Sequence, residues 1–263
     1  MKVVLLLVCL AGLAAAQVST TTNAPPKLKN FGWLVGANRA TLREFPFSGL
    51  LFGDEAKCSC TLIKPDLVLT AAHCVASQKP GYVYFGSVHQ DDGNEVKNTY
   101  TEVHLHPDYL SSGRQSGYDI AVVRLDGPYT LSNRINLARL PSGDNSYEGR
   151  LAWATAFGTI NNDDEASNYL MKAPMTVVKQ DMCNFYYAGP GDDKLVCTTS
   201  PALLCNGDSG GGLVVRDLLS WRVIGVASVK KVPYGRDPCN RLIPSGYVRV
   251  SEHLDFIKSV MQE

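Results

Sequence analysis

The stretch Leu67-Val68-Leu69-Thr70-Ala71-Ala72-His73-Cys74 joins a short apolar run to a polar, potentially reactive end. Its first four residues have the length and composition of a buried β-strand. Similar short runs recur between turn residues at Tyr82–Phe85, Ile120–Leu125, Thr176–Val178, Leu213–Val215, Val223–Val226 and Tyr247–Val250. The intervals are too short for βαβ crossovers, so we predict an all-β antiparallel sandwich or barrel.

The two ends of the chain depart from this pattern. Leu254, Ile257, Lys258 and Met261 follow helical spacing after Ser251, a residue type suited to cap a helix, and predict one terminal helix. Residues 17–33 are polar and Thr-rich and show no regular apolar period, so we expect an extended or disordered leader there.

The first 16 residues have the composition of a secretory signal. Lys2 precedes an apolar run, and Ala14-Ala15-Ala16 offers small residues for cleavage after Ala16. The alternative is a membrane anchor, but the apolar stretch spans 14 residues, whereas a bilayer span needs about 20. We expect a signal peptide over residues 1–16, a propeptide over 17–33 and one domain over 34–263, in a soluble secreted, extracellular protein.

Composition excludes several classes of protein. The 263 residues are 45% hydrophobic and 19% charged, which is enough apolar material for a folded core. Lys plus Arg and Asp plus Glu each number 25, so no basic excess favours nucleic acid as a partner. Eight cysteines indicate an oxidising compartment, and loss of Cys9 with the signal leaves an odd number, seven.

Three segments carry candidate chemistry: Thr70–Cys74, Asp119–Leu125 and Cys205–Gly211. Singly, they read as a structural histidine, a turn aspartate and a glycine-rich loop. Together, in the order His, Asp, Ser, they resemble the trypsin/chymotrypsin family of serine proteases (peptidase family S1). The resemblance extends over nearly all of residues 34–263 and implies a trypsin-like serine protease domain there, with two six-stranded antiparallel β-barrels, a C-terminal helix and an active site between the barrels.

The resemblance implies a role for each of five residues. Ser209 is the nucleophile, His73 the general base and Asp119 the group that orients the base. The backbone N–H groups of Gly207 and Ser209 resemble the oxyanion hole, and Ser228 the serine that hydrogen-bonds the buried aspartate. A histidine suits the base because its ordinary pKa, about 6.5, is close to the working pH. We predict activity that rises as the base loses its proton and needs no cofactor or metal.

The primary pocket departs from that of trypsin-like members. Leu203 stands at its base, where those members carry Asp, and with Leu204 it implies an apolar, chymotrypsin-like or elastase-like preference. Ser228 and Ser245 also fall at substrate-binding positions by resemblance. Lys230 replaces a Gly at the pocket mouth, where it could obstruct the site. Substrates are expected to be proteins or peptides, with protein protease inhibitors as further partners of a monomer.

Activation also departs from the family pattern. By resemblance, Asp208 forms an ion pair with the α-amino group of Leu34 after cleavage, yet the preceding residue is Trp33 rather than Arg or Lys. Either a chymotrypsin-like protease, including this enzyme itself, makes the cut, or the chain stays zymogen-like or is cut elsewhere, as after Lys27 or Lys29. A second hypothesis is a non-catalytic homologue that acts as a secreted binding protein. It is motivated by Trp33, by Lys230 and by the loop Lys231 to Pro238, which is longer than usual for the family.

By resemblance the cysteines form three disulfides: Cys58–Cys74, Cys183–Cys197 and Cys205–Cys239. Cys60 is left over, either as a buried unreactive thiol or as a covalent link between two chains. No other cysteine is free to share a zinc site. Asp91, Asp92 and Glu95 do not form a convincing calcium pattern, so we predict no metal.

Overall fold

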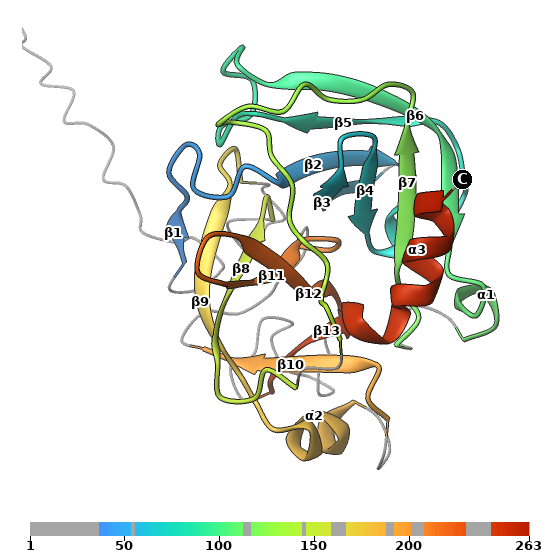
Figure 1. Cartoon of the computed structure of the whole chain (residues 1–263), viewed down its shortest axis with the longest axis vertical. Coiled ribbons are helices and arrows are strands. Elements are labelled where there is room, and N and C mark those ends of the chain that lie inside the picture. Colours follow the sequence, from blue (N-terminus) through green and yellow to red (C-terminus); the bar gives the residue numbers. More distant parts are fainter. Residues whose placement is uncertain are drawn as a thin grey trace, which may run out of the picture. The chain divides into compact units, whose positions relative to one another are not determined.

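The computed structural model of the chain describes residues 37–53, 56–112, 117–143, 146–158, 167–187, 192–200, 208–229 and 243–262. Within these ranges the strands form two sheets, each closed on itself (Figure 1). The predicted signal peptide and propeptide lie outside the described residues.

The first barrel has the strand order β2-β3-β4-β7-β6-β5, with β5 pairing back onto β2. Every pairing in it is antiparallel. All four residues of β4 are buried, which is why this strand reads as a continuous apolar run rather than an alternating one. The strands are β2 (Ser48–Gly53), β3 (Ala56–Lys64), β4 (Leu67–Thr70), β5 (Gly81–Phe85), β6 (Val96–Leu105) and β7 (Ala121–Leu125).

The second barrel is built from β8 (Leu151–Ala156), β9 (Met171–Val177), β10 (Leu195–Thr199), β13 (Ser245–Arg249), β12 (Trp221–Val229) and β11 (Gly212–Arg216). The strands follow one another in that order, and β11 pairs back onto β8. A two-residue strand, β1 (Asn38–Arg39), adds to β9. The expectation of two six-stranded antiparallel barrels is therefore confirmed.

Strand β9 starts at Met171, earlier than the predicted start at Thr176. Its buried residues alternate with polar or half-buried ones, so Met171, Ala173 and Met175 face the core while Lys172 and Pro174 do not. This period of two marks a half-buried strand, but Lys172 and Pro174 interrupt any continuous apolar run.

The two barrels meet through aromatic rings and a buried hydroxyl pair. The ring of Phe45, which precedes β2, lies 6.3 Å from that of Trp153 in β8 and 4.9 Å from that of Trp221 in β12. Ser48 Oγ and Thr155 Oγ1 share a buried hydrogen bond of 2.9 Å across the same contact. Large aromatic surfaces of this kind stabilise a fixed arrangement of the barrels.

The terminal helix begins differently from the prediction. Ser251 lies inside a 3-10 turn, η2 (Val250–His253), so it does not cap the helix α3 (Leu254–Gln262) that follows. The other end of α3 is held by the first barrel: Lys64 Nζ donates to the carbonyl of Met261 and Arg124 to that of Val260, both at 2.6 Å. These cations satisfy carbonyls that a helix end leaves unpaired.

Two further short helices were not predicted: α1 (Tyr109–Ser112) and α2 (Gln180–Tyr186). Neither has an apolar face of helical period, and Met182 and Phe185 of α2 are exposed. The α2 turn is instead held by tertiary contacts, including a disulfide from Cys183. Helices this short depend on such contacts because they are marginal in isolation.

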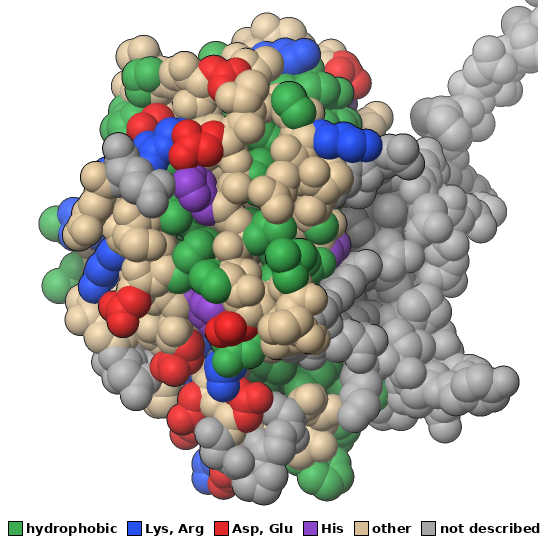
Figure 2. Space-filling view, turned by 90° about the vertical axis from the view of Figure 1, so that its right-hand side faces the viewer, with side chains coloured by type: hydrophobic (Ala, Val, Ile, Leu, Met, Phe, Trp, Pro, Cys, Tyr) green, Lys and Arg blue, Asp and Glu red, His purple; other side chains and the backbone are tan. Residues whose placement is uncertain are grey.

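None of the helices in the described ranges is long and apolar enough to cross a membrane. On the described part of the face in Figure 2, acidic and basic side chains are interspersed rather than gathered by sign. That distribution agrees with the balanced composition of the chain.

Candidate active site

His73 lies in a tight turn at the end of a buried strand. Strand β4 runs directly into the 3-10 turn η1 (Ala72–Cys74), where Cys74 N donates to Ala71 O at 3.1 Å. The disulfide Cys58–Cys74 ties this turn to β3. The turn hydrogen bond and the disulfide therefore fix the backbone of His73, so that only the side-chain torsions of the imidazole can adjust.

Asp119 lies just before β7, and its side chain is fully buried. Its Oδ1 accepts the backbone N–H of His73 at 2.8 Å, and its Oδ2 lies 2.7 Å from His73 Nδ1. Ser228 Oγ donates to the same Oδ2 at 2.5 Å. Three donors thus replace the water that a buried carboxylate loses. An ionised carboxylate only accepts hydrogen bonds, so it places the imidazole proton on Nδ1 and leaves Nε2 as an acceptor.

Ser209 belongs to a turn that is held by both barrels. Its carbonyl accepts the backbone N–H of Ser59 in β3, and the N–H of Gly210 donates to Ala227 in β12, each at 2.8 Å. Ala227 immediately precedes Ser228. The hydrogen bonds therefore bring the serine turn next to the strand that supports Asp119.

Gly210 shows how closely this turn approaches the histidine turn. Its φ is +80°, and an added Cβ would lie 2.2 Å from the carbonyl oxygen of Ser59 and 2.3 Å from Thr70 Oγ1. Only glycine fits such a contact without displacing the first barrel. The motif residues His73, Asp119 and Ser209 are thus brought together, although the Ser209 hydroxyl makes no hydrogen bond to His73 among the described residues. Such contacts often tighten only when substrate is bound.

Two of the other predicted residues are also buried in the second barrel. Asp208 is 2% exposed, and its carboxylate lies so close to Gly158 that a Cβ there would meet it at 2.0 Å. Ser245 is 3% exposed and lies opposite Thr198 in the β10–β13 ladder. Seven residues predicted for the site lie outside the described residues: Leu34, Leu203, Leu204, Cys205, Gly207, Lys230 and Cys239.

The disulfides Cys58–Cys74 and Cys183–Cys197 are present. Cys60 carries a free thiol that is 1% exposed, and burial raises its pKa well above the ordinary value for a cysteine. A buried, protonated thiol is a poor nucleophile, which favours the unreactive role over a link between chains.

Among the described residues, one group of side chains has the proximity of metal ligands: Cys58, His73 and Cys74. Both sulfur atoms belong to a disulfide, so they have no thiolate to offer a metal.

Sequence reasoning missed Ser59 and Thr70 as supports of the serine turn. Ser59 Oγ accepts the N–H of Phe157, while Thr70 Oγ1 donates to Ser59 O, both at 2.9 Å. The first contact joins residues that are 98 positions apart in the chain, and the second joins residues that are 11 positions apart. Thr70 is three residues before His73 in the quoted motif, but nothing in the pattern indicated its partner.

Comparisons with known proteins agree with this geometry. The family described as Trypsin matches residues 34–257. A curated relative, chymotrypsin-like elastase family member 1 of Rattus norvegicus, is 31% identical over 212 residues, which cover 78% of this chain and 78% of the relative. The chain therefore belongs to the trypsin family and is a serine endopeptidase of the chymotrypsin-like kind.

Proposed function

We propose that the protein hydrolyses peptide bonds through a covalent acyl-enzyme formed on Ser209, with His73 as general base and Asp119 as its orienting group. The observation that carries this proposal is the buried Asp119 carboxylate, which accepts hydrogen bonds from the main chain and the ring of His73. The same carboxylate oxygen also accepts from Ser228, whose neighbour Ala227 holds the serine turn. This arrangement directs the basic nitrogen of His73 away from Asp119.

The chemistry that we propose is that of the Ser-His-Asp triad. Ser209 Oγ attacks the substrate carbonyl carbon while His73 Nε2 takes the hydroxyl proton. The N–H groups of Gly207 and Ser209 stabilise the negative oxygen that forms, and a single donor of this kind can contribute about 3 kcal/mol. His73 returns its proton to the departing amine as the C–N bond breaks. Water then repeats the attack on the ester and frees Ser209.

The substrate preference is proposed from Leu203 and Leu204, with Ser228 and Ser245 as further pocket residues. A leucine at the base of the primary pocket cannot pair with Arg or Lys, so we propose apolar residues before the cut bond. A peptide-library profile dominated by Arg or Lys would contradict this preference.

We further propose that cleavage before Leu34 activates the enzyme and that its new amino group pairs with Asp208. The support is the resemblance to the trypsin family, in which the aspartate directly before the nucleophile takes this role; Asp208 is 2% exposed. Secretion is proposed from the signal-like residues 1–16, with residues 17–33 as the propeptide and residues 34–263 as the protease domain. Protein inhibitors and a monomeric state belong to the same proposal.

The deciding experiment compares two recombinant chains that begin at Leu34 and at Trp33. Each is treated with a fluorophosphonate probe, and the labelled residue is read by mass spectrometry, with Ser209→Ala as the negative control. We expect rapid labelling of Ser209 only in the chain that begins at Leu34. The unprocessed protein is treated with chymotrypsin in parallel, to learn whether Trp33 is cut and labelling appears.

The second candidate, a non-catalytic binding protein, is motivated by Lys230 at the position of the pocket mouth. It predicts no labelling even when the chain begins at Leu34. In that event a Lys230→Gly variant would test whether this side chain blocks the site. Equal labelling of both chains would instead contradict the Leu34–Asp208 pairing.

A further inference from the structure

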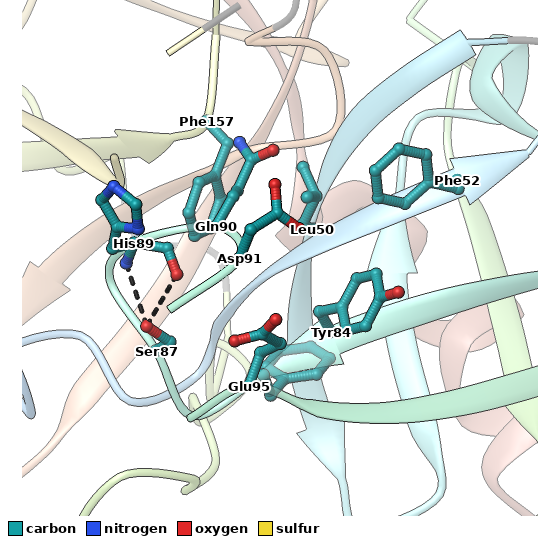
Figure 3. A pocket seen from close by; sticks show the side chains of 10 residues that line it. Leu50, Phe52, Tyr84, Ser87, His89, Gln90, Asp91, Glu95 and Phe157 are labelled. Atoms are coloured by element: carbon teal, nitrogen blue, oxygen red, sulfur yellow. Dashed lines mark hydrogen bonds between the residues drawn. The ribbon is translucent and has the colours of Figure 1, made fainter. Parts of the chain in front are cut away.

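A second pocket lies outside the catalytic residues, beside β2, β5 and the loop that follows β5 (Figure 3). It is an open depression: its empty space of about 370 Å³ includes open solvent, and its cavity volume is about 30 Å³. Leu50, Phe85 and Phe157 contribute buried apolar side chains to its lining. Phe52 and Tyr84 add partly exposed aromatic rings. The apolar part of the pocket therefore offers a surface along which a hydrocarbon chain can pack.

Carboxylates face the same pocket. Asp91 and Glu95 line it together with the ring of Tyr84, as Figure 3 shows. Glu95 Oε2 is shut off from solvent and accepts no hydrogen bond from any residue that the structure describes. A buried oxygen left in this condition is costly, so a cation brought to the exposed part of this half-buried side chain would stabilise the carboxylate.

The acidic groups impose a negative potential on the aromatic side of the pocket. The pKa of Tyr84 is raised, first by burial and then by Tyr82, Glu95 and Asp91. Two cations lie nearby. Lys57 acts on Asp91, and its own pKa is lowered by burial, while Lys97 Nζ lies 4.1 Å from the ring centroid of Tyr82 and 5.9 Å from that of Tyr84. Asp91 is therefore partly compensated, whereas Glu95 shares a side-chain hydrogen bond with a second carboxyl group, that of Asp92, rather than with a cation.

The pocket is one strand away from the nucleophile turn. Leu50 of β2 lies opposite Ser59 of β3, and the N–H of Ser59 donates to the Ser209 carbonyl at 2.8 Å. Phe157, on the other side of the pocket, donates its N–H to Ser59 Oγ at 2.9 Å. Paired strands are about 4.8 Å apart and an extended chain advances about 3.3 Å per residue, so a few residues of one polypeptide span the distance.

We propose that this pocket binds a Lys or Arg side chain of a polypeptide whose neighbouring segment occupies the catalytic cleft. The methylene groups pack on Tyr84 and the buried apolar side chains, while the cationic head donates to Glu95. The basic residue would lie a few positions from the cut bond rather than at it, where Leu203 favours apolar groups. This inference rests on the proposed function and names a second element of its substrate recognition.

The test measures peptide binding rather than turnover. Fluorescent peptides carry Lys or its uncharged isostere norleucine at successive positions on both sides of an apolar residue, and bind to the Ser209→Ala variant in the presence of EDTA. Fluorescence anisotropy gives the ratio of the two affinities. Glu95→Gln in the same background removes the charge but keeps the shape, and Asp255→Asn removes one exposed charge on α3 as the matched control.

At one position we expect the Lys peptide to bind about fivefold more tightly than the norleucine peptide, the gain of one charged hydrogen bond at a partly exposed site. The ratio should fall close to one in Glu95→Gln and persist in Asp255→Asn. Equal affinities at every position, no binding of any peptide, or a ratio that survives Glu95→Gln would overturn the proposal. Because no turnover is needed, these outcomes are independent of probe labelling at Ser209.

Discussion

Two histidines, the half-buried His73 and the buried His253, contact the segment that carries Asp119, and their surroundings differ sharply. His73 has a carboxylate on its Nδ1, whereas His253 hydrogen-bonds the backbone of Gly117 and packs 5.8 Å from the ring of Tyr118. His253 Nε2 is buried and has no hydrogen-bond partner among the described residues. The positive charge of a protonated ring is therefore stabilised at His73 and destabilised at His253.

The pKa of His253 reflects this environment. It is lowered to about 4 overall, chiefly by burial, with smaller lowering effects from His106 and Lys194 that the Gly117 backbone and Asp108 oppose. The rings of His106 and His253 lie 4.8 Å apart, and Phe256 packs on His106 at 5.1 Å. The rings of His106 and His253 also pack on Tyr118, the residue directly before Asp119. Burial of a histidine is thus not itself a sign of catalysis. The group that hydrogen-bonds the ring distinguishes a catalytic histidine from a structural one.

The largest expected effect comes from removing the carboxylate that distinguishes His73. In Asp119→Asn the amide no longer holds the imidazole proton on Nδ1, so the wrong ring nitrogen faces Ser209. We expect kcat/KM on an apolar peptide to fall by roughly 10⁴, measured on the chain that begins at Leu34. Thermal unfolding serves as the control for folding. A loss below tenfold would remove Asp119 from the mechanism.

The next effect concerns the acid sensitivity of His253. Because its folded pKa is lowered to about 4, the unfolded chain binds more protons between about pH 6.5 and 4, and stability falls as the pH falls through that window. The loss is on the order of 3 kcal/mol. His253→Phe keeps the packing and removes the titration, so its free energy of unfolding should depend less on pH in chemical denaturation. Parallel pH curves for the two proteins would contradict this account.

A smaller effect is expected at Ser228, which supports Asp119 from β12. Ser228→Ala removes the donor to Asp119 Oδ2 but leaves both contacts with His73. We expect about a tenfold slower fluorophosphonate labelling, the cost of one hydrogen bond to a charged group. Ser259→Ala, an exposed serine on α3, is the matched control. An unchanged rate would show that two donors suffice for Asp119.

The smallest effect is expected at His106. Its pKa is also lowered by burial, although Asp108 opposes the shift. His106→Phe leaves the exposed N–H of Asp108 to water and should reduce the acid sensitivity of folding less than His253→Phe does. NMR titration of both histidines checks the order of their pKa values, and a lower pKa for His106 than for His253 would reverse it.

Much of this architecture could be predicted from local pattern. The run Leu67–Thr70 is the strand β4, and Leu213–Val215 lies within β11, because β-branched and apolar residues between turns suit a buried strand. The terminal helix was predicted, but its start was not. Ser251 looks like a cap in the sequence, yet β13 leads into a 3-10 turn that places it one turn too early.

The supports of the site could not be predicted. Ser59 and Thr70 hold the serine turn through bonds to residues far along the chain, and β-barrel contacts of that kind leave no periodic signal. The pocket at Glu95 is similar, since Phe157 reaches it from the second barrel. In the sequence, Asp91, Asp92 and Glu95 indicated only an unconvincing calcium pattern.

The sequence by itself determined the residue types, their order and the class of fold, because short apolar strands and the segments around His73, Asp119 and Ser209 are local features. The tertiary structure decided which groups meet. Barrel closure placed Ser228 on Asp119 and Ser59 on Ser209, and left His253 without a carboxylate. The physical reason is that hydrogen bonding and desolvation act between neighbours in space, and those neighbours are set by strand register rather than by distance along the chain.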